Sequence, residues 1–197
     1  MRRLIGLVLV VATAVGAGLA AQSSGSRGRG SSPTLPIIVF ETDKGTIEME
    51  MYPNEAPKSV EHILTLARRN FYNGLRVHRV VPGFVVQFGD PLTRDMTKKA
   101  VWGSGGSGRT VGVAEISPKR PHKLGAVAMA HTGDPKDADS QIYICLNGPA
   151  RYQELVQGKY AVIGQVISGM DVVQKLQVPD VIKRATVKEP GRGATAK

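Results

Sequence analysis

Residues 77–90 read VHRVVPGFVVQFGD, two short apolar runs joined by Pro82 and Gly83. Runs rich in Val and Phe that are separated by Pro and Gly are typical of two β-strands with a turn between them. Strand alternation places Arg79 on the face opposite His78 and Val80, and it does not tell which face meets solvent. The segment therefore predicts a hairpin. A single arginine in a strand is usually solvated or salt-bridged, and the alternative is that Arg79 is a functional residue.

The chain on both sides of this segment repeats the β pattern. The apolar run IIVF (37–40) leads to the turn TDKG (42–45), after which residues 46–51 alternate strictly, which predicts a hairpin with one buried side. Further short apolar runs are separated by Gly and Pro, at 77–81, 84–87, 124–130, 142–146 and 160–166. A last strand is expected over 181–187. Many short strands with turn signals predict a mainly β barrel or sandwich.

Two short helices are expected among these strands. After Pro57, the apolar residues Val60, Ile63, Leu64 and Ala67 recur at helical spacing, and proline is favoured at the first helical position. A second helix is expected after the Ser-Gly-Met run at 168–170. The apolar stripe of the first helix should cover an open end of the sheet or barrel.

The N-terminal residues differ in composition from the rest of the chain. Residues 1–21 join two arginines to an uncharged apolar run that ends in small residues, which predicts a secretory signal peptide; a retained anchor is the competing interpretation. Residues 22–35 are rich in Ser, Gly and Arg and are expected to be a flexible linker. The folded domain is expected over 36–188, with a disordered tail over 189–197. The chain is therefore expected to be exported, to the periplasm or the medium, with no membrane span after cleavage.

Composition narrows the functional classes. The length of 197 residues and the hydrophobic content of 42% suit one domain. The net charge of +10 falls to +8 if Arg2 and Arg3 leave with the signal; it makes acidic surfaces, anionic lipid or nucleic acid weak partners without naming an activity. Aromatic residues make up 5% and the basic residues are dispersed, so no specific nucleic-acid site is expected.

The residues that usually bind metals or form covalent intermediates are sparse. Cys145 is the only cysteine, which excludes an internal disulfide framework and a CxxC motif and suits a small buried packing residue. The four histidines have no ligand spacing and no accompanying carboxylate cluster. No GxSxG motif is present. We therefore expect no metal and no cofactor.

Two further segments carry polar groups that are candidates for a site. Gln141 and Tyr143 share one strand face, so they predict either a groove lined by an amide and an aromatic ring or an ordinary edge strand. Residues 103–109 read GSGGSGR and superficially suggest a phosphate-binding loop, but they lack the Lys-Ser/Thr ending and a following helix. A mobile surface loop is the expectation there.

Taken together, these residues resemble the cyclophilin family of peptidyl-prolyl cis-trans isomerases. The resemblance runs from about residue 37 to residue 188 and is carried by three motifs in the family's order: VHRVVPGFVVQFGD (77–90), GAVAMAH (125–131) and SQIYI (140–144). It implies a closed eight-stranded antiparallel β-barrel capped by two short α-helices, in accord with the strands and helices expected above.

The resemblance also implies a set of site residues. By motif position, Arg79 is similar to the family's catalytic arginine. The implied substrate-binding residues are His78, Phe84, Gln87, Met129, Ala130, His131, Gln141, Tyr143, Leu155, Val156 and Tyr160. This sequence departs from the family at His131, where Asn is common, at Tyr143, where Phe is frequent, and at Leu155, Val156 and Tyr160, where many members carry Trp, Leu and His.

The function implied is rotation about Xaa-Pro bonds to assist the folding of exported proteins. The partners implied are proline-containing peptides and unfolded or partly folded proteins, and a monomer is expected. An alternative is a non-catalytic proline-binding chaperone or scaffold. It is suggested by Leu155 and Tyr160, which differ from the residues common in the family. A basic module that binds anionic surfaces is a third hypothesis.

Overall fold

The computed structural model describes residues 34–191 of the chain. The expected signal peptide, residues 22–33 of the expected linker and residues 192–197 of the expected tail lie outside the described residues. Within residues 34–191, no helix has the length and apolar character needed to cross a membrane. Glu189, in the segment expected as a tail, accepts hydrogen bonds from Arg68 Nε and Nη2 at 3.0 and 3.3 Å.

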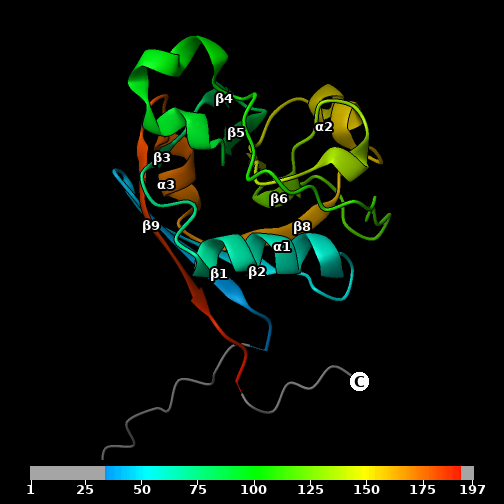
Figure 1. Cartoon of the computed structure of the whole chain (residues 1–197). Coiled ribbons are helices and arrows are strands. Elements are labelled where there is room, and N and C mark those ends of the chain that lie inside the picture. Colours follow the sequence, from blue (N-terminus) through cyan, green and yellow to red (C-terminus); the bar gives the residue numbers. More distant parts are fainter. Residues whose placement is uncertain (1–33, 192–197) are drawn as a thin grey trace, which may run out of the picture. The chain divides into compact units, whose positions relative to one another are not determined.

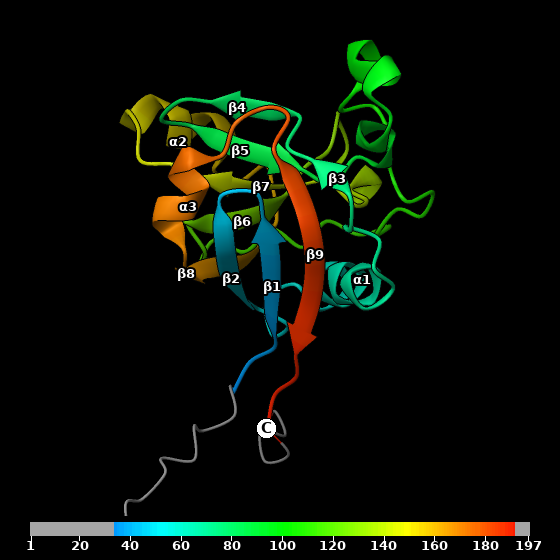
Figure 2. The ribbon, with the colours of Figure 1, turned by 90° about the vertical axis from the view of Figure 1, so that its left-hand side faces the viewer.

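The described region is built around one antiparallel sheet (Figures 1 and 2). Its strands are β1 (Ile37–Thr42), β2 (Gly45–Met51), β3 (Leu75–Arg76), β4 (Arg79–Val81), β5 (Val85–Phe88), β6 (Ala126–Met129), β7 (Ile142–Cys145), β8 (Val162–Ser168) and β9 (Val181–Lys188). Their order across the sheet is β3-β9-β1-β2-β8-β6-β7-β5-β4. The expected hairpins and the mainly β class are confirmed.

The two edge strands of this sheet, β3 and β4, are neighbours in the chain. Only Val77 and His78 separate them; Val77 N donates to Asp180 O at 2.9 Å, and His78 N donates to Gln87 O at 3.2 Å. The sheet therefore curls until its edges meet through this connection. The nine strands of the sheet become the eight expected when β3 and β4 are counted as one strand that is interrupted at these two residues.

Alternation along the strands sends side chains into two separate apolar clusters. Val86 and Phe88 of β5 join the interior cluster, in which Phe40 packs edge-to-face on Tyr72 and on Phe88 with ring centroids 5.4 and 5.2 Å apart. Val85, on the other face of β5, belongs to a smaller cluster outside the curled sheet. β6 and β7 divide in the same way, so this part of the sheet is buried on both faces.

Helices cover the ends and one side of the sheet. α1 (Pro57–Arg68) begins with proline at its first turn, as expected, and packs against β9; α3 (Met170–Lys175) packs against β2 (Figure 2). The structure adds α2 (Ala150–Val156) and the 3₁₀ helices η1 (Pro91–Arg94), η2 (Met96–Val101) and η3 (Pro135–Asp137). α2 was not expected from the sequence, because its seven residues carry no regular apolar stripe.

Candidate active site

Four strands of the sheet align the candidate residues in one row. Arg79 of β4 lies opposite Gln87 of β5, Gln87 lies opposite Tyr143 of β7, and Tyr143 lies opposite Ala128 of β6. Directly opposed residues point to the same face of a sheet. Because Ala128 and Tyr143 belong to the outer cluster, the row lies on the outside of the curled sheet and not in its interior.

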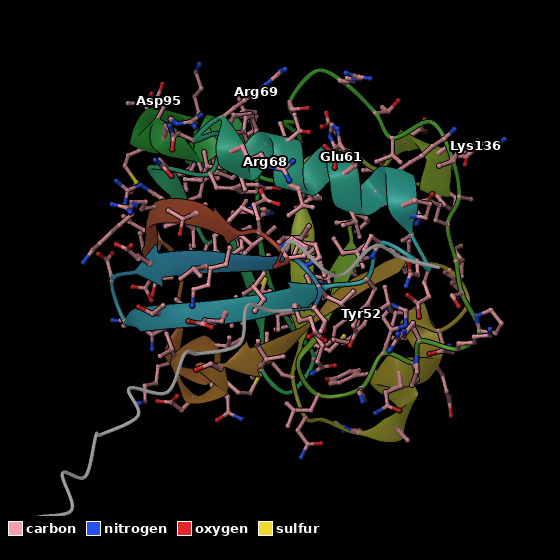
Figure 3. All side chains as sticks on the ribbon, turned by 90° about the horizontal axis from the view of Figure 1, so that it is seen from below. Tyr52, Glu61, Arg68, Arg69, Asp95 and Lys136 are labelled. Atoms are coloured by element: carbon pink, nitrogen blue, oxygen red, sulfur yellow. The ribbon has the colours of Figure 1, made fainter. Side chains whose placement is uncertain are left out.

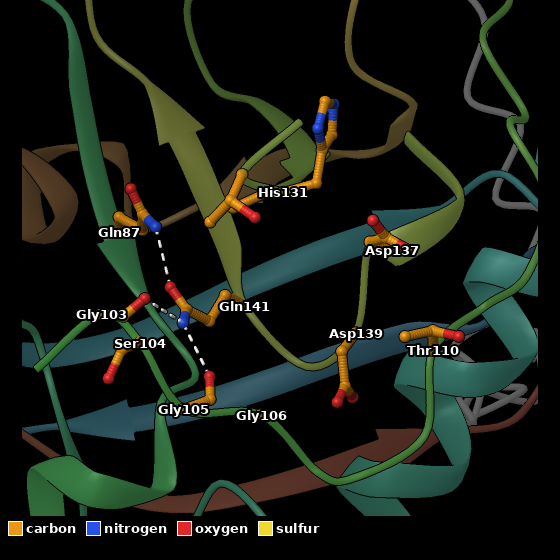
Figure 4. Close-up of a pocket in the computed structure, with 12 residues that line it drawn as sticks. Gln87, Gly103, Ser104, Gly105, Gly106, Thr110, His131, Asp137, Asp139 and Gln141 are labelled. Atoms are coloured by element: carbon orange, nitrogen blue, oxygen red, sulfur yellow. Dashed lines mark hydrogen bonds between the residues drawn. The ribbon is translucent and has the colours of Figure 1, made fainter. Parts of the chain in front are cut away.

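A chain of hydrogen bonds begins at the Arg79 guanidinium. Arg79 Nη1 donates to Gln87 Oε1 at 3.2 Å, and Gln87 Nε2 donates to Gln141 Oε1 at 2.9 Å. Gln141 Nε2 then donates to the carbonyl oxygens of Gly103 and Gly105, both at 2.8 Å (Figure 4). Arginine can only donate hydrogen bonds, so this chain fixes the orientation of both amides.

The exposed guanidinium borders a cavity of about 230 Å³, here called the Arg79 cavity. Its lining residues are Arg79, Phe84, Val85, Gln87, Ala130, His131, Tyr143, Val156 and Tyr160. An apolar cavity of about 150 Å³ accommodates a benzene ring, so this one has room for a five-membered ring. The lining is mostly apolar with a few polar groups at one side, which is typical of a small-ligand site.

Aromatic contacts hold the walls of the Arg79 cavity in place. The ring of His131 lies 4.3 Å from that of Tyr160, and Tyr160 meets Tyr143 edge-on at 5.7 Å. The Arg79 guanidinium carbon lies 5.8 Å from the centre of the Phe84 ring, within the range of a cation–π contact. His131 Nε2 is 3.0 Å from Lys159 O, which ties this side chain to the loop before β8.

Burial shifts the pKa values of several titratable side chains in and around the site. The Tyr143 hydroxyl is buried without a hydrogen-bond partner among the described residues, and burial raises its pKa. His122 stacks on Tyr143 at 6.0 Å, and burial lowers the pKa of its imidazole, as it does for His78. Burial raises the pKa of the Cys145 thiol to about 12, in keeping with the packing role expected for it.

Most of the residues implied by the resemblance come together at this place, and three do not. Eight line the Arg79 cavity: Arg79, Phe84, Gln87, Ala130, His131, Tyr143, Val156 and Tyr160. Gln141 lines the hollow next to it. Met129 lies on the inner face of β6, 1% exposed in the interior cluster. His78 packs beside Gly103 and lines neither hollow, and Leu155 is 55% exposed on α2.

The adjoining hollow, of about 240 Å³, is here called the Gln141 cavity. It shares Gln87, Ala130 and His131 with the Arg79 cavity. Residues outside the set implied by the resemblance complete its lining: Gly103, Ser104, Gly105, Gly106, Thr110, Thr132, Asp137 and Asp139 (Figure 4). In the sequence, the glycine-rich run at 103–108 is the feature that marks this part of the site.

This glycine-rich segment, expected to be a mobile surface loop, is hydrogen-bonded to the rest of the domain. Gly103 N donates to the buried Asp90 carboxylate, and Gly108 N donates to Asp139 Oδ2 at 3.1 Å. A Cβ at Gly105 would meet the Asp90 carboxylate, and one at Gly106 would meet Asp139. Glycine is required there because the backbone lies directly against the two carboxylates.

Within residues 34–191, no three His, Cys, Asp or Glu side chains gather closely enough to hold a metal ion. The chemistry available at the site is that of a guanidinium, two oriented amides and an apolar cavity. Such a set can bind and polarise a neutral polar group without covalent change.

Comparison with known proteins shows which family the chain matches. The family model of the cyclophilin type peptidyl-prolyl cis-trans isomerases/CLD matches residues 37–192. A probable peptidyl-prolyl cis-trans isomerase of Brucella suis is 37% identical over 159 residues, covering 79% of this chain and 78% of the relative. Peptidyl-prolyl cis-trans isomerase B of Bacillus subtilis is 35% identical over 146 residues, covering 74% and 93%.

Solved structures agree on the fold. A cyclophilin type isomerase of Cryptosporidium parvum, crystallised in the presence of the dipeptide Ala-Pro, aligns with a TM-score of 0.65 at 22% identity over 77% of this chain and 98% of that one. The cyclophilin AquaCyp293 of Hirschia baltica aligns with a TM-score of 0.64 at 23% identity, over 79% and 75%. The chain belongs to the cyclophilin-type peptidyl-prolyl cis-trans isomerases. It is an enzyme of that class, and the resemblance seen in its three motifs is confirmed.

Proposed function

We propose that Arg79 is the catalytic group of this isomerase and that the Arg79 cavity binds the substrate's proline ring. The observation that carries the proposal is the hydrogen-bond chain from Arg79 through Gln87 to Gln141, which holds a guanidinium at the edge of an apolar cavity. The Ala-Pro dipeptide present with the Cryptosporidium parvum relative supports a proline-containing ligand.

The reaction needs no covalent chemistry from the protein. Resonance gives the peptide C–N bond partial double-bond character and a rotation barrier of about 18–20 kcal/mol. In the twisted state the prolyl nitrogen recovers its lone pair and becomes a hydrogen-bond acceptor, which it is not in either planar state. A donor aimed at this nitrogen therefore binds the twisted state more tightly than the planar ones, which is the requirement for catalysis.

Arginine suits this role because it stays charged and presents several donors in a rigid plane. Gln87 accepts from only one guanidinium nitrogen, Nη1, so other N–H groups remain to donate to a substrate. The cavity walls hold the ring while amide groups of the site hold the adjoining backbone, so that one side of the bond rotates against the other. Shortening exchange from tens of seconds to milliseconds is about 10⁴-fold, or about 5–6 kcal/mol, which a few aimed hydrogen bonds can supply.

The test measures isomerisation of a short Xaa-Pro peptide by the chain without the expected signal peptide, residues 22–197. We expect Arg79→Ala to lower kcat/KM by about 10²–10³-fold, the usual cost of removing one aimed donor. Arg79→Lys should recover little, because an ammonium lacks the planar fork. Arg69→Ala is the matched control, since Arg69 is an exposed arginine at the C-cap of α1 that lines neither cavity.

Two results would contradict this assignment. Equal rates for the wild type and Arg79→Ala would remove the role of Arg79. Peptide binding without catalysed exchange in NMR spectra would instead indicate a proline-binding scaffold, the alternative considered from the sequence.

We also propose that the enzyme acts on exported proteins outside the cytoplasm. The support is the sequence of residues 1–21, a basic start followed by an apolar run with a small-residue end. Residues 1–36 fused to a phosphatase that is active only after export should give activity, and Val10→Arg, which interrupts the apolar run, should abolish it. A cytoplasmic, uncleaved fusion would overturn the proposal.

A further inference from the structure

A third hollow lies beside the two that form the site. It has a volume of about 500 Å³ and is here called the Lys58 cavity. Lys58, Glu61 and His62 of α1 line one side of it, and Arg109, Thr110 and Val111 line the other. Thr110 also lines the Gln141 cavity, and Figure 4 shows it between that cavity and α1. Through these shared lining residues the Arg79, Gln141 and Lys58 cavities adjoin one another in that order, and this succession is here called the path.

The boundary between the Gln141 and Lys58 cavities is fixed by contacts below Thr110. His62 Nε2 lies 3.2 Å from Asp139 Oδ1, and Asp139 also accepts from Gly108 N at 3.1 Å and from the Ser107 hydroxyl. Val111 N donates to Ala138 O at 2.8 Å. These bonds join α1, the segment 107–111 and the segment before β7. The path is thus preformed, which reduces the ordering cost of binding a chain along it.

The charges change along this path. Asp137 lines the Gln141 cavity, whereas the Lys58 cavity is bordered by Lys58 and Arg109. No ion pair of either cation is formed with another residue of the described part of the chain. Glu61, the acidic residue of this hollow, is engaged by Arg68 Nη1 at 3.2 Å and by the Thr65 hydroxyl at 3.0 Å; Figure 3 shows Glu61 and Arg68 along α1.

A second carboxylate, that of Glu115, lies at the start of α1. Glu115 accepts hydrogen bonds from the backbone N–H groups of Lys58 and Ser59, at 3.0 and 2.8 Å. These hydrogen bonds do not remove the charge of either carboxylate, but the described lining of the Lys58 cavity holds two cations against the one carboxylate of Glu61. Among the described residues, the Gln141 cavity is lined by Asp137 and Asp139 and by no Lys or Arg. The Lys58 cavity therefore favours an acidic side chain, while Asp137 disfavours one in the Gln141 cavity.

We propose that the Lys58 cavity is a subsite for an acidic side chain of the same polypeptide whose proline occupies the Arg79 cavity. This rests on the function proposed above, because the path begins at the proline site. An extended chain advances about 3.3 Å per residue, so a polypeptide that leaves the Arg79 cavity must cross the Gln141 cavity before a side chain reaches the Lys58 cavity. The acidic residue is therefore several positions from the proline. The enzyme then prefers substrates with a distant acidic residue over those with one adjacent to proline.

The experiment compares peptides that carry one proline and a single Glu or Gln three, four or five residues before or after it. Dissociation constants and isomerisation rates are measured at low salt and at about 0.5 M salt. In at least one placement the Glu peptide should bind about 3–10-fold more tightly than its Gln partner, as expected for two exposed cations. The gain should appear in KM and not in kcat, and it should vanish at high salt.

Paired variants separate this subsite from general charge effects. Lys58→Gln with Arg109→Gln should abolish the difference between Glu and Gln peptides. Lys99→Gln with Arg69→Gln removes the same charge from exposed positions that do not line the path and should preserve it. Equal affinity of Glu and Gln peptides in every placement, or equal losses in both double variants, would overturn the subsite.

The wild type's turnover of the Gln peptides distinguishes the two proposals. Turnover without a preference for Glu overturns the subsite alone. A preference for Glu in binding without turnover supports the subsite and overturns the catalytic role of Arg79.

Discussion

At the scale of single residues, two buried tyrosines show that the contribution of a hydroxyl to folding stability depends on its hydrogen-bond partner. Tyr72 is fully buried, and its hydroxyl donates to Ser140 O at 2.9 Å. Tyr143 is 4% exposed, and its hydroxyl has no partner among residues 34–191. A buried polar group without a hydrogen bond costs about 1–3 kcal/mol, whereas one that is paired is close to neutral or favourable.

We therefore expect Tyr143→Phe to stabilise the protein by about 1 kcal/mol and to raise Tm by about 2–4 °C. Isomerase activity should remain, because the ring that lines the Arg79 cavity is kept. Tyr72→Phe is the matched control and should destabilise by about 1–3 kcal/mol, since it leaves Ser140 O without its donor. Thermal and urea unfolding of both variants check this; a loss of stability in Tyr143→Phe would show that the hydroxyl has a partner.

At the scale of elements, the segment 103–108 joins the site to the rest of the sheet. Its carbonyls accept from Gln141, and its N–H groups donate to Asp90 and Asp139. Displacing this segment would disturb Gln141 and, through Gln87, the Arg79 guanidinium. The segment is thus a positioning element for a residue that is far from it in the sequence.

Gly105→Ala tests this connection. The added Cβ would meet the Asp90 carboxylate and the Leu92 side chain, so the segment must move. We expect a loss of about 1–3 kcal/mol in stability, as for other overpacked sites, and a fall in kcat/KM of up to about 10²-fold. The matched control is Gly133→Ala, because Gly133 has no atom within 4 Å of an added Cβ. Unchanged kinetics in Gly105→Ala would contradict the positioning role.

At the scale of the whole molecule, buried histidines make stability depend on pH. Burial lowers the pKa of His122 and of His78 below that of an unfolded chain, which is about 6.5. Above that pH both states are neutral. As pH falls below it, the unfolded chain binds protons that the folded histidines do not, so folding stability decreases until the folded pKa is reached.

We expect a lower urea midpoint at pH 5.5 than at pH 7.5. The gap should narrow in His122→Gln, whose side chain is neutral throughout. Lys99→Gln, at an exposed position, is the control and should keep the wild-type gap. An identical pH dependence in His122→Gln would show that this histidine is not responsible.

Local pattern was enough to predict most of the strands and two helices. The alternation at 46–51 and the helical spacing after Pro57 each reflect a single buried face, which a linear sequence records directly. The three motifs also located most of the cavity lining. Met129, which the motif resemblance groups with the substrate-binding residues, lies on the inner face of β6. This strand is buried on both faces, so its apolar run does not tell which residues face the site.

The sequence by itself therefore determined the class of fold, the family and the identity of Arg79 as the candidate donor. Only the tertiary structure decided that the row Arg79–Gln87–Tyr143 lies on the outside of the curled sheet, and that the segment 103–108 lies against Asp90 and Asp139. The physical reason is that periodicity along a chain shows only which positions within one helix or strand share a buried face. Which residues share a face and a cavity is fixed by pairing between strands that are distant in sequence.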